Sequence, residues 1–276
     1  ICAYGNSIGL LLEQQSIQKR QHNGTCLGFA WSPLNPEPAE IGASHSDWGD
    51  LPGTGKELAH VQARIAGEYY WGQDAKEGLF KQKAPEFGIL HLALHGKAGE
   101  NDPFIVFPAK NDASEDEMLS LKEVYGIRLN AELAVLSACE SGNGVVHQEE
   151  GTLSMARGFL FSGIPTVVTN LWEVEDHAAQ EIIDQFYADL AEGKPVDESL
   201  HHAQVKYLHS ALNANASPFF WASFISLGKS GKIDHLKVAN SGWTENFILG
   251  VVILSALAML IFFVIRIKRK RKSLSF

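Results

Sequence analysis

The chain has 276 residues, of which 45% are hydrophobic, so it is long enough for one large domain or two small ones with a packed core. This composition excludes a disordered or a fibrous protein. Acidic residues outnumber basic ones by 32 to 23, which gives a formal net charge of −9 and argues against nucleic acid as the main partner, because phosphate binding needs a basic face.

The cysteine pattern bears on metal and redox chemistry. Cys2, Cys26 and Cys139 are too few and too scattered for a disulfide framework or a tetrahedral zinc site, and no CxxC pair exists. We therefore expect no metal and no cofactor. In an oxidising compartment Cys2 and Cys26 could pair, which would leave Cys139 as the single thiol.

Several apolar segments of strand length are bounded by turn residues and are rich in β-branched or aromatic side chains. They are CLGFAW (26–31), FGILHLAL (87–94), ELAVLSA (132–138), TVVTNLW (166–172) and FWASFISLG (220–228). Helices are predicted between them, over residues 55–66, within 151–165, over 176–192 and over 197–212. This alternation predicts an α/β fold with a mostly parallel sheet and helices on both faces.

The stretch GDLPGTGKE (49–57) raises the question of a phosphate-binding loop. That motif needs a glycine well before the Gly-Lys pair and a serine or threonine directly after it, whereas Asp50 and Glu57 stand at those positions. We interpret the stretch as a turn that leads into a helix, and we expect no nucleotide there.

Two chemically capable residues stand at the predicted carboxyl ends of neighbouring strands, where ligands bind in parallel sheets. His95 follows FGILHLAL and precedes Gly96, and Cys139 follows ELAVLSA. An imidazole can take the proton of a thiol, whose ordinary pKa of about 8.5 leaves it weakly nucleophilic at neutral pH. The pair therefore predicts a catalytic dyad, with the amides of Gly96 and Cys139 as donors to an oxyanion. The alternative is that both are inert strand-end residues, since free cysteine is among the most buried residue types.

The other histidines show no ligand pattern. His91 and His95 have an HxxxH spacing, but Leu92 replaces the glutamate of the zinc peptidases and the segment is a predicted strand. His91 is therefore expected in the core or directly behind the site. The histidines in polar surroundings are expected at the surface: His147, His177, His201 and His202.

These motifs resemble one known family. ILHLALHG, LAVLSACESGNG, EGTLSMARGFLFSGIPTVVTNLWEVED and PFFWASFISLG, together with LPGTGKELAHVQ, are similar to the CHAT domain over about residues 1–228. CHAT domains are caspase-like cysteine peptidases related to separase, and they are often attached to tetratricopeptide repeats. The resemblance implies a caspase-like fold with His95 and Cys139 as the dyad and the Gly96 and Cys139 amides as oxyanion donors. Family members begin with further strands upstream of ICAYGNSIGLLL, and the chain opens at Ile1 without a methionine, so we expect an N-terminally truncated domain.

The stretch NLWEVED predicts a substrate preference. In separase relatives a similar tryptophan-acidic stretch helps to hold a basic substrate side chain, and Glu173 and Asp176 stand at comparable positions here. Their carboxylates would select Lys or Arg through charge-assisted hydrogen bonds. The alternative is that Asp176 caps the helix that follows.

The C-terminal part predicts a membrane anchor. Residues 247–265, FILGVVILSALAMLIFFVI, contain no charged side chain, and a helix of that length spans roughly 28 Å, which matches the hydrocarbon core of a bilayer. A polar tether over residues 229–246 precedes this segment, and a basic tail over residues 266–276 follows it. The positive-inside rule places the tail in the cytoplasm and the soluble domain outside, provided that an export signal precedes the fragment. Without such a signal, the protein would be tail-anchored with its domain in the cytosol.

Two functions are compatible with these features. The first is a membrane-anchored cysteine endopeptidase that cleaves a protein partner through a thioester at Cys139. The second is a catalytically silent caspase-like scaffold or signalling module that is tethered to the membrane and serves an upstream repeat domain, because a fold does not guarantee an activity.

Overall fold

The structure is a computed structural model of the chain. It describes residues 21–35, 48–49, 51–97, 103–108, 116–137, 148–172, 174–211 and 213–239. The chain divides into two compact units, residues 1–239 and 240–276, and all described residues belong to the first. Within this described part, no helix has the length and apolar character that a membrane crossing requires. The predicted membrane segment 247–265 and the basic tail lie outside the described residues.

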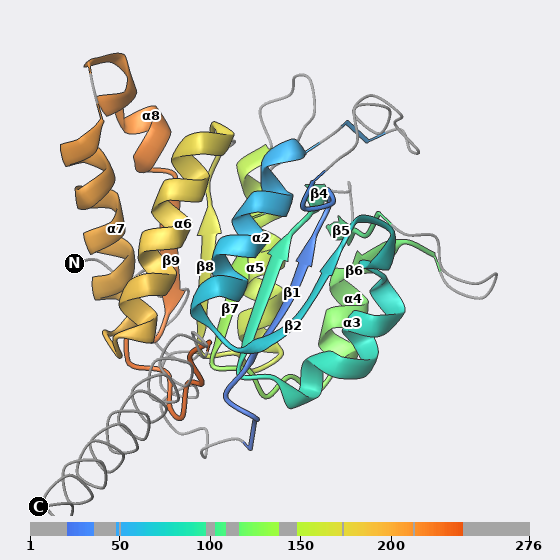
Figure 1. The fold of residues 1–276 in the computed structure, drawn as a ribbon. Coiled ribbons are helices and arrows are strands. Elements are labelled where there is room, and N and C mark those ends of the chain that lie inside the picture. The colour runs from blue at the N-terminus through green and yellow to red at the C-terminus, as the bar shows by residue number, and fades with distance from the viewer. Residues whose placement is uncertain are drawn as a thin grey trace, which may run out of the picture. The chain divides into compact units, whose positions relative to one another are not determined.

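A six-stranded sheet forms the centre of the domain, with the strand order β2-β1-β3-β7-β8-β9 (Figure 1). Its strands are β1 (Cys26–Ala30), β2 (Gly67–Trp71), β3 (Ile89–Ala93), β7 (Leu133–Leu136), β8 (Thr166–Asn170) and β9 (Phe224–Gly228). All neighbours pair in parallel except β8 and β9, which pair antiparallel. The mostly parallel sheet is thus confirmed, and each predicted strand segment contains a strand of it, but residues 220–221, which were predicted to begin the last strand, belong to a short helix, and β9 begins at Phe224. β2 was not expected, because this edge strand is half-exposed and its sequence, GEYYW, contains no apolar run.

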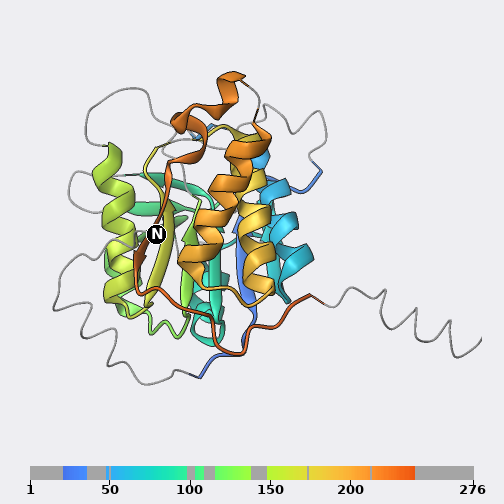
Figure 2. The same ribbon diagram turned by 90° about the vertical axis from the view of Figure 1, so that its left-hand side faces the viewer.

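Helices cover both faces of the sheet, as predicted (Figure 2). On one face lie α2 (Pro52–Arg64), α6 (Asp176–Ala191) and α7 (Val196–Ser210), and on the other lie α3 (Glu77–Lys83), α4 (Leu121–Gly126) and α5 (Gln148–Phe161). A short helix, α8 (Pro218–Trp221), precedes β9, and 3-10 turns occur at Gly72–Asp74, Ala84–Glu86 and Asn213–Ala216. Helix α2 begins earlier than predicted because Pro52, whose fixed φ suits a first turn, stands at its N-terminus.

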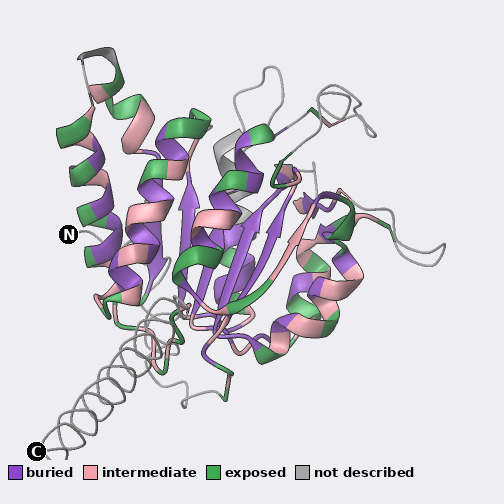
Figure 3. Cartoon of the chain, viewed as in Figure 1, coloured by how far each residue is buried: buried purple, intermediate pink, exposed green. Residues whose placement is uncertain are grey.

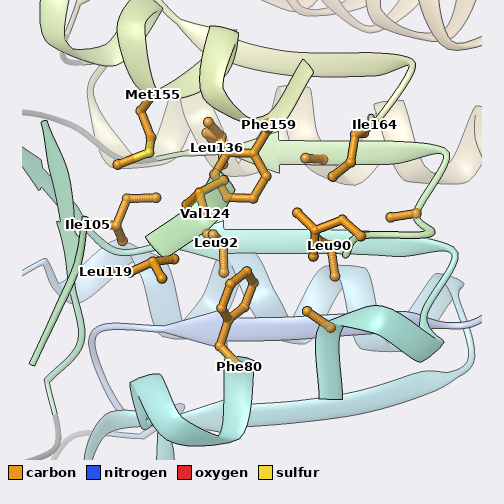
Figure 4. Packing of buried hydrophobic residues seen from close by; sticks show 14 of the residues in the cluster. Phe80, Leu90, Leu92, Ile105, Leu119, Val124, Leu136, Met155, Phe159 and Ile164 are labelled. Carbon is orange, nitrogen blue, oxygen red and sulfur yellow. The ribbon is translucent and has the colours of Figure 1, made fainter. Parts of the chain in front are cut away.

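The core has two halves, one on each face of the sheet. Successive residues of a strand point to opposite faces, so Leu90 and Leu92 pack towards α3, α4 and α5, whereas Ile89 packs towards α2 and α6. Figure 4 shows the first half, in which Phe80 and Phe159 lie over the central strands. The central strands are buried along their length (Figure 3), as expected for a parallel sheet that is covered on both faces.

A small antiparallel sheet follows β3 and corrects one prediction. It contains β4 (His95–Lys97), β5 (Phe104–Val106) and β6 (Met118–Ser120), in that order. β3 therefore ends at Ala93, the chain bends at Leu94, and His95 belongs to the small sheet rather than to the end of the predicted strand. The physical reason is the pairing of β4 with β5, which takes the backbone out of the main sheet.

A buried carboxylate lies at the start of α3. Glu77 is fully buried, and its Oε1 lies 2.7 Å from Nζ of Lys81, which also lies 2.7 Å from Oε1 of Glu123. Burial raises the pKa of Glu77 from 4.5 to about 7; the Lys81 ammonium opposes this shift, and the Glu123 and Asp116 carboxylates add to it. Glu77 therefore holds its proton more tightly in the folded protein than in the unfolded chain.

This difference predicts a pH dependence of stability. The contribution of Glu77 is complete below pH 4.5 and is lost as the pH rises through about 7. In Glu77→Gln the free energy of unfolding should therefore fall less steeply as the pH rises, by at most about 3 kcal/mol. Urea unfolding at pH 5 and pH 8 measures this difference. Glu198→Gln, a change at an exposed carboxylate, should keep the wild-type slope. A wild-type slope in Glu77→Gln would contradict the prediction.

Candidate active site

The carboxyl ends of the parallel strands form one edge of the main sheet, and α2 and α6 begin at this edge (Figure 1). β1 leads into Trp31, β3 leads towards His95, and β7 leads into Ser137. Backbone hydrogen bonds continue past the strand ends: the Trp31 N–H donates to the Ala93 carbonyl (2.9 Å), and the Ser137 N–H donates to the Leu92 carbonyl (3.0 Å). Residues that are far apart in the sequence therefore meet where parallel sheets bind their ligands.

His95 is fully buried at this edge. Its Nε2 lies 2.7 Å from the carbonyl oxygen of Gly49, and since a carbonyl only accepts, the imidazole donates from Nε2. The Trp31 ring meets the imidazole edge-to-face at 4.3 Å between centroids, and the Trp48 ring lies 5.9 Å away. These contacts hold the ring in place, and in the neutral imidazole with its proton on Nε2 the basic nitrogen is Nδ1.

The other predicted catalytic groups are described only in part. Gly96 is half-buried in β4, opposite Ile105 of β5. Cys139 lies outside the described residues, and Ser137 is the last described residue before it. The predicted pairing of the two strands is confirmed, because β3 and β7 are parallel neighbours. The sheet thus brings the chain segment that leads into Cys139 beside the one that leads into His95.

The predicted substrate pocket is also described in part. Glu173 lies outside the described residues, and Asp176 opens α6. The Asp176 carboxylate accepts a hydrogen bond from the backbone N–H of Gly53, in the first turn of α2. Partial burial raises the pKa of Asp176, and the bond from Gly53 opposes this shift. The capping alternative is wrong, because the side chain of Glu175 caps α6 by accepting from the N–H of Ala178 (3.1 Å).

Comparison with known families identifies the family of this chain. The model of the family described as the CHAT domain matches residues 3–229. The chain belongs to the CHAT domain family. The crystal structure of the Saccharomyces cerevisiae separase–securin complex contains a similar chain, with 14% sequence identity and a TM-score of 0.48; the match covers 81% of this chain and 13% of that one. No curated protein matches this CHAT domain significantly.

Beneath the edge, this CHAT domain holds a buried polar network that the sequence did not predict. It consists of Glu57 from α2, His91 from β3, Ser137 after β7 and Tyr187 from α6. The Ser137 hydroxyl donates to Oε2 of Glu57 (3.0 Å), Nε2 of His91 lies 3.1 Å from Oε1 of Glu57, and Nδ1 of His91 lies 3.0 Å from the Tyr187 hydroxyl. His91 is fully buried, as predicted for a residue in the core or directly behind the site. The sequence feature that could have revealed this network is Glu57, because it is a charged residue on the helix face that also carries Leu58 and Val61, which are buried.

Cys26 is the one cysteine among the described residues. It is a free thiol, buried in β1, and burial raises its pKa to about 12, although a hydrogen bond with Tyr69 opposes the shift. The disulfide considered between Cys2 and Cys26 is therefore not formed. At neutral pH this thiol is protonated and shielded, so Cys26 is unreactive.

Three of the four histidines predicted at the surface are among the described residues. His177, His201 and His202 are exposed, as expected, and the His202 ring pairs with Asp189. His147 lies outside the described residues.

Proposed function

We propose that this CHAT domain is a cysteine endopeptidase in which His95 and Cys139 form the catalytic dyad. The observation that carries the proposal is the placement of His95: its Nε2 bonds to the Gly49 carbonyl, and it follows β3, the parallel neighbour of the strand that leads into Cys139. Membership of the CHAT family, which is related to caspase-like peptidases, supports the same chemistry.

The proposed reaction is an acyl transfer. The basic Nδ1 of His95 takes the thiol proton of Cys139, and the sulfur attacks the substrate carbonyl carbon to form a tetrahedral oxyanion. The amides of Gly96 and Cys139 stabilise this oxyanion. The C–N bond then breaks, the proton on His95 goes to the leaving amine, and a water molecule hydrolyses the thioester in the reverse sequence of proton transfers.

A protein with an exposed lysine or arginine is the proposed substrate. Asp176 supports this preference, since its partly exposed carboxylate stands at the carboxyl edge of the sheet, and Glu173 precedes it by three residues in the sequence. A cationic side chain would exchange water for charge-assisted hydrogen bonds with these carboxylates.

The same proposal includes a membrane anchor over residues 247–265, with the basic tail 266–276 in the cytoplasm and the peptidase domain outside. The uncharged sequence of the segment and the six cations between Arg266 and Lys272 support it. The tail-anchored arrangement, with the domain in the cytosol, is the alternative. Protease protection of the domain in sealed membrane vesicles distinguishes the two orientations.

A thiol-labelling experiment tests the dyad without a known substrate. In a Cys2→Ser background, iodoacetamide at pH 7 should alkylate Cys139 at least about tenfold faster than Cys26, because only a thiol with a neighbouring base is appreciably ionised at this pH. His95→Gln should lower the Cys139 rate about tenfold by removing that base. Peptide mass spectrometry measures both rates. Equal labelling of Cys139 with and without His95, in folded protein, would refute the dyad.

One observation favours a second candidate, the silent scaffold. The imidazole of His95 is fully buried between Trp31 and Trp48, so a substrate cannot reach it in this state. A silent module would keep this state in the presence of its partners, and His95→Gln would then leave the Cys139 labelling rate unchanged under all conditions.

A further inference from the structure

The buried polar network links the elements that form the catalytic edge. Glu57 lies one turn into α2, and the start of α2 is fixed to the end of β1: the Ser32 hydroxyl donates to the Leu51 carbonyl (2.8 Å), and the Ser32 N–H donates to Oγ1 of Thr54 (3.1 Å). From this anchored helix, the Glu57 carboxylate reaches the Ser137 hydroxyl at the end of β7. The network thus links the carboxyl end of β1 to the carboxyl end of β7, the strand that precedes Cys139.

Stability alone does not account for this network. Glu57 is only 4% exposed and is surrounded by the apolar residues of α2 that face the sheet. A buried carboxylate and imidazole lose their hydration, and well-packed apolar residues of the same volume often stabilise a core as well or better. The Glu57 Oε1 and His91 Nε2 atoms, although 3.1 Å apart, are not aligned as a hydrogen bond, so the pair recovers only part of this loss.

The partners of Glu57 hold it in one orientation. His91 is fixed by the rigid central strand β3 and by the Tyr187 hydroxyl at 3.0 Å, and its ring in turn limits where Oε1 of Glu57 can lie. The other carboxylate oxygen is then directed at Ser137. Ser137 is itself bonded through its N–H to Leu92, so both its backbone and its side chain are fixed.

We infer that Glu57 is a positioning residue for the nucleophile. By holding the Ser137 hydroxyl, it fixes the direction in which the chain leaves β7, and that direction sets where Cys139, two residues later, presents its sulfur to His95. This role rests on the proposed function, because it requires Cys139 to be the reacting group.

The experiment measures Cys139 reactivity and stability in the same variants. Glu57→Met replaces the carboxylate by an apolar side chain of similar size, and Glu57→Gln and Ser137→Ala remove the charge and the hydroxyl separately. In the Cys2→Ser background, Glu57→Met and Ser137→Ala should each lower the rate at which iodoacetamide alkylates Cys139 at pH 7 by about fivefold to tenfold. The melting temperature of Glu57→Met should equal or exceed that of the parent. Glu57→Gln should lower the Cys139 labelling rate less, because its amide oxygen can still accept a hydrogen bond from the Ser137 hydroxyl.

The double variant decides whether Glu57 acts through Ser137. Glu57→Met combined with Ser137→Ala should label no more slowly than either single variant, because both remove the same interaction. Glu68→Gln, which changes a carboxylate of the exposed edge strand β2, is the matched control and should label within twofold of the parent. If Glu57→Met does not fold, Glu57→Gln and Ser137→Ala provide the same comparison.

The outcomes separate the two claims. Parental labelling rates in the folded Glu57 and Ser137 variants would overturn the positioning role and leave the dyad intact. If the decreases in the Cys139 labelling rate multiply in the double variant, the claim that Glu57 acts through Ser137 is overturned. A parent whose Cys139 labels no faster than Cys26 would overturn the proposed function, and the positioning role with it.

Discussion

Replacing Cys139 with alanine is expected to reduce peptide-bond cleavage by at least about 10⁴-fold, to the background of the uncatalysed reaction. Cys26, the one cysteine among the described residues, cannot replace it, because its thiol is buried and has a pKa of about 12. The measurement uses a library of peptides from a digested proteome and detects new termini by mass spectrometry. Because the library offers many sequences at once, the same sample also tests the proposed preference for Lys or Arg.

Two further variants make this result specific. Cys26→Ala removes a thiol that plays no part in the reaction and should leave the set of cleaved peptides unchanged, apart from any loss of stability. Asp176→Asn should reduce cleavage after Lys and Arg relative to other residues, because it removes one of the proposed charge partners. Cleavage by Cys139→Ala at the parent's rate would end the peptidase proposal.

Gly55→Ala should have the largest effect on stability, lowering the free energy of unfolding by about 2–3 kcal/mol. A Cβ atom at this position would lie 2.3 Å from the carbonyl oxygen of Pro33, which is backbone and cannot rotate away. The neighbouring Ser32 is bonded to both Leu51 and Thr54, so α2 cannot shift without breaking these bonds. Thermal unfolding monitored by circular dichroism should show a melting temperature lower by roughly 5–10 °C.

The matched control is Gly126→Ala, at the end of α4, where a Cβ atom would meet nothing within 4 Å. Its free energy of unfolding should stay within about 1 kcal/mol of the parent, because alanine is the better helix former. Equal stability of the Gly55 and Gly126 variants would show that α2 is free to move away from the end of β1.

The sequence predicted the parts of the fold whose apolar pattern is long and regular. The strands β1, β3, β7, β8 and β9 are buried runs between turn residues, and the helices α6 and α7 lie close to the ranges predicted for them. The edge strand β2 and the elements of the small sheet are short or half-exposed, so their sequences carry little periodicity.

The site was predicted less completely, for reasons that particular residues illustrate. His95 was placed at the end of a strand because the apolar run continues through Leu94, and a bend in the backbone leaves no mark on hydrophobicity. Glu57 escaped notice because a carboxylate in a helix next to Lys56 is typical of a solvated face; only the tertiary contacts with His91 and Ser137 reveal its burial. Cys139 and Glu173 lie outside the described residues and stay predictions.

The contact between α2 and α6 at Gly53 links two positions that are distant in the sequence. A Cβ atom on residue 53 would lie 2.4 Å from Cγ of Asp176, so any larger residue there would displace the acid from the helix start that now receives it. The two positions are therefore coupled: relatives that have lost the glycine should more often have exchanged the acid as well, and under the proposed peptidase function such paired exchange would mark a change in substrate preference.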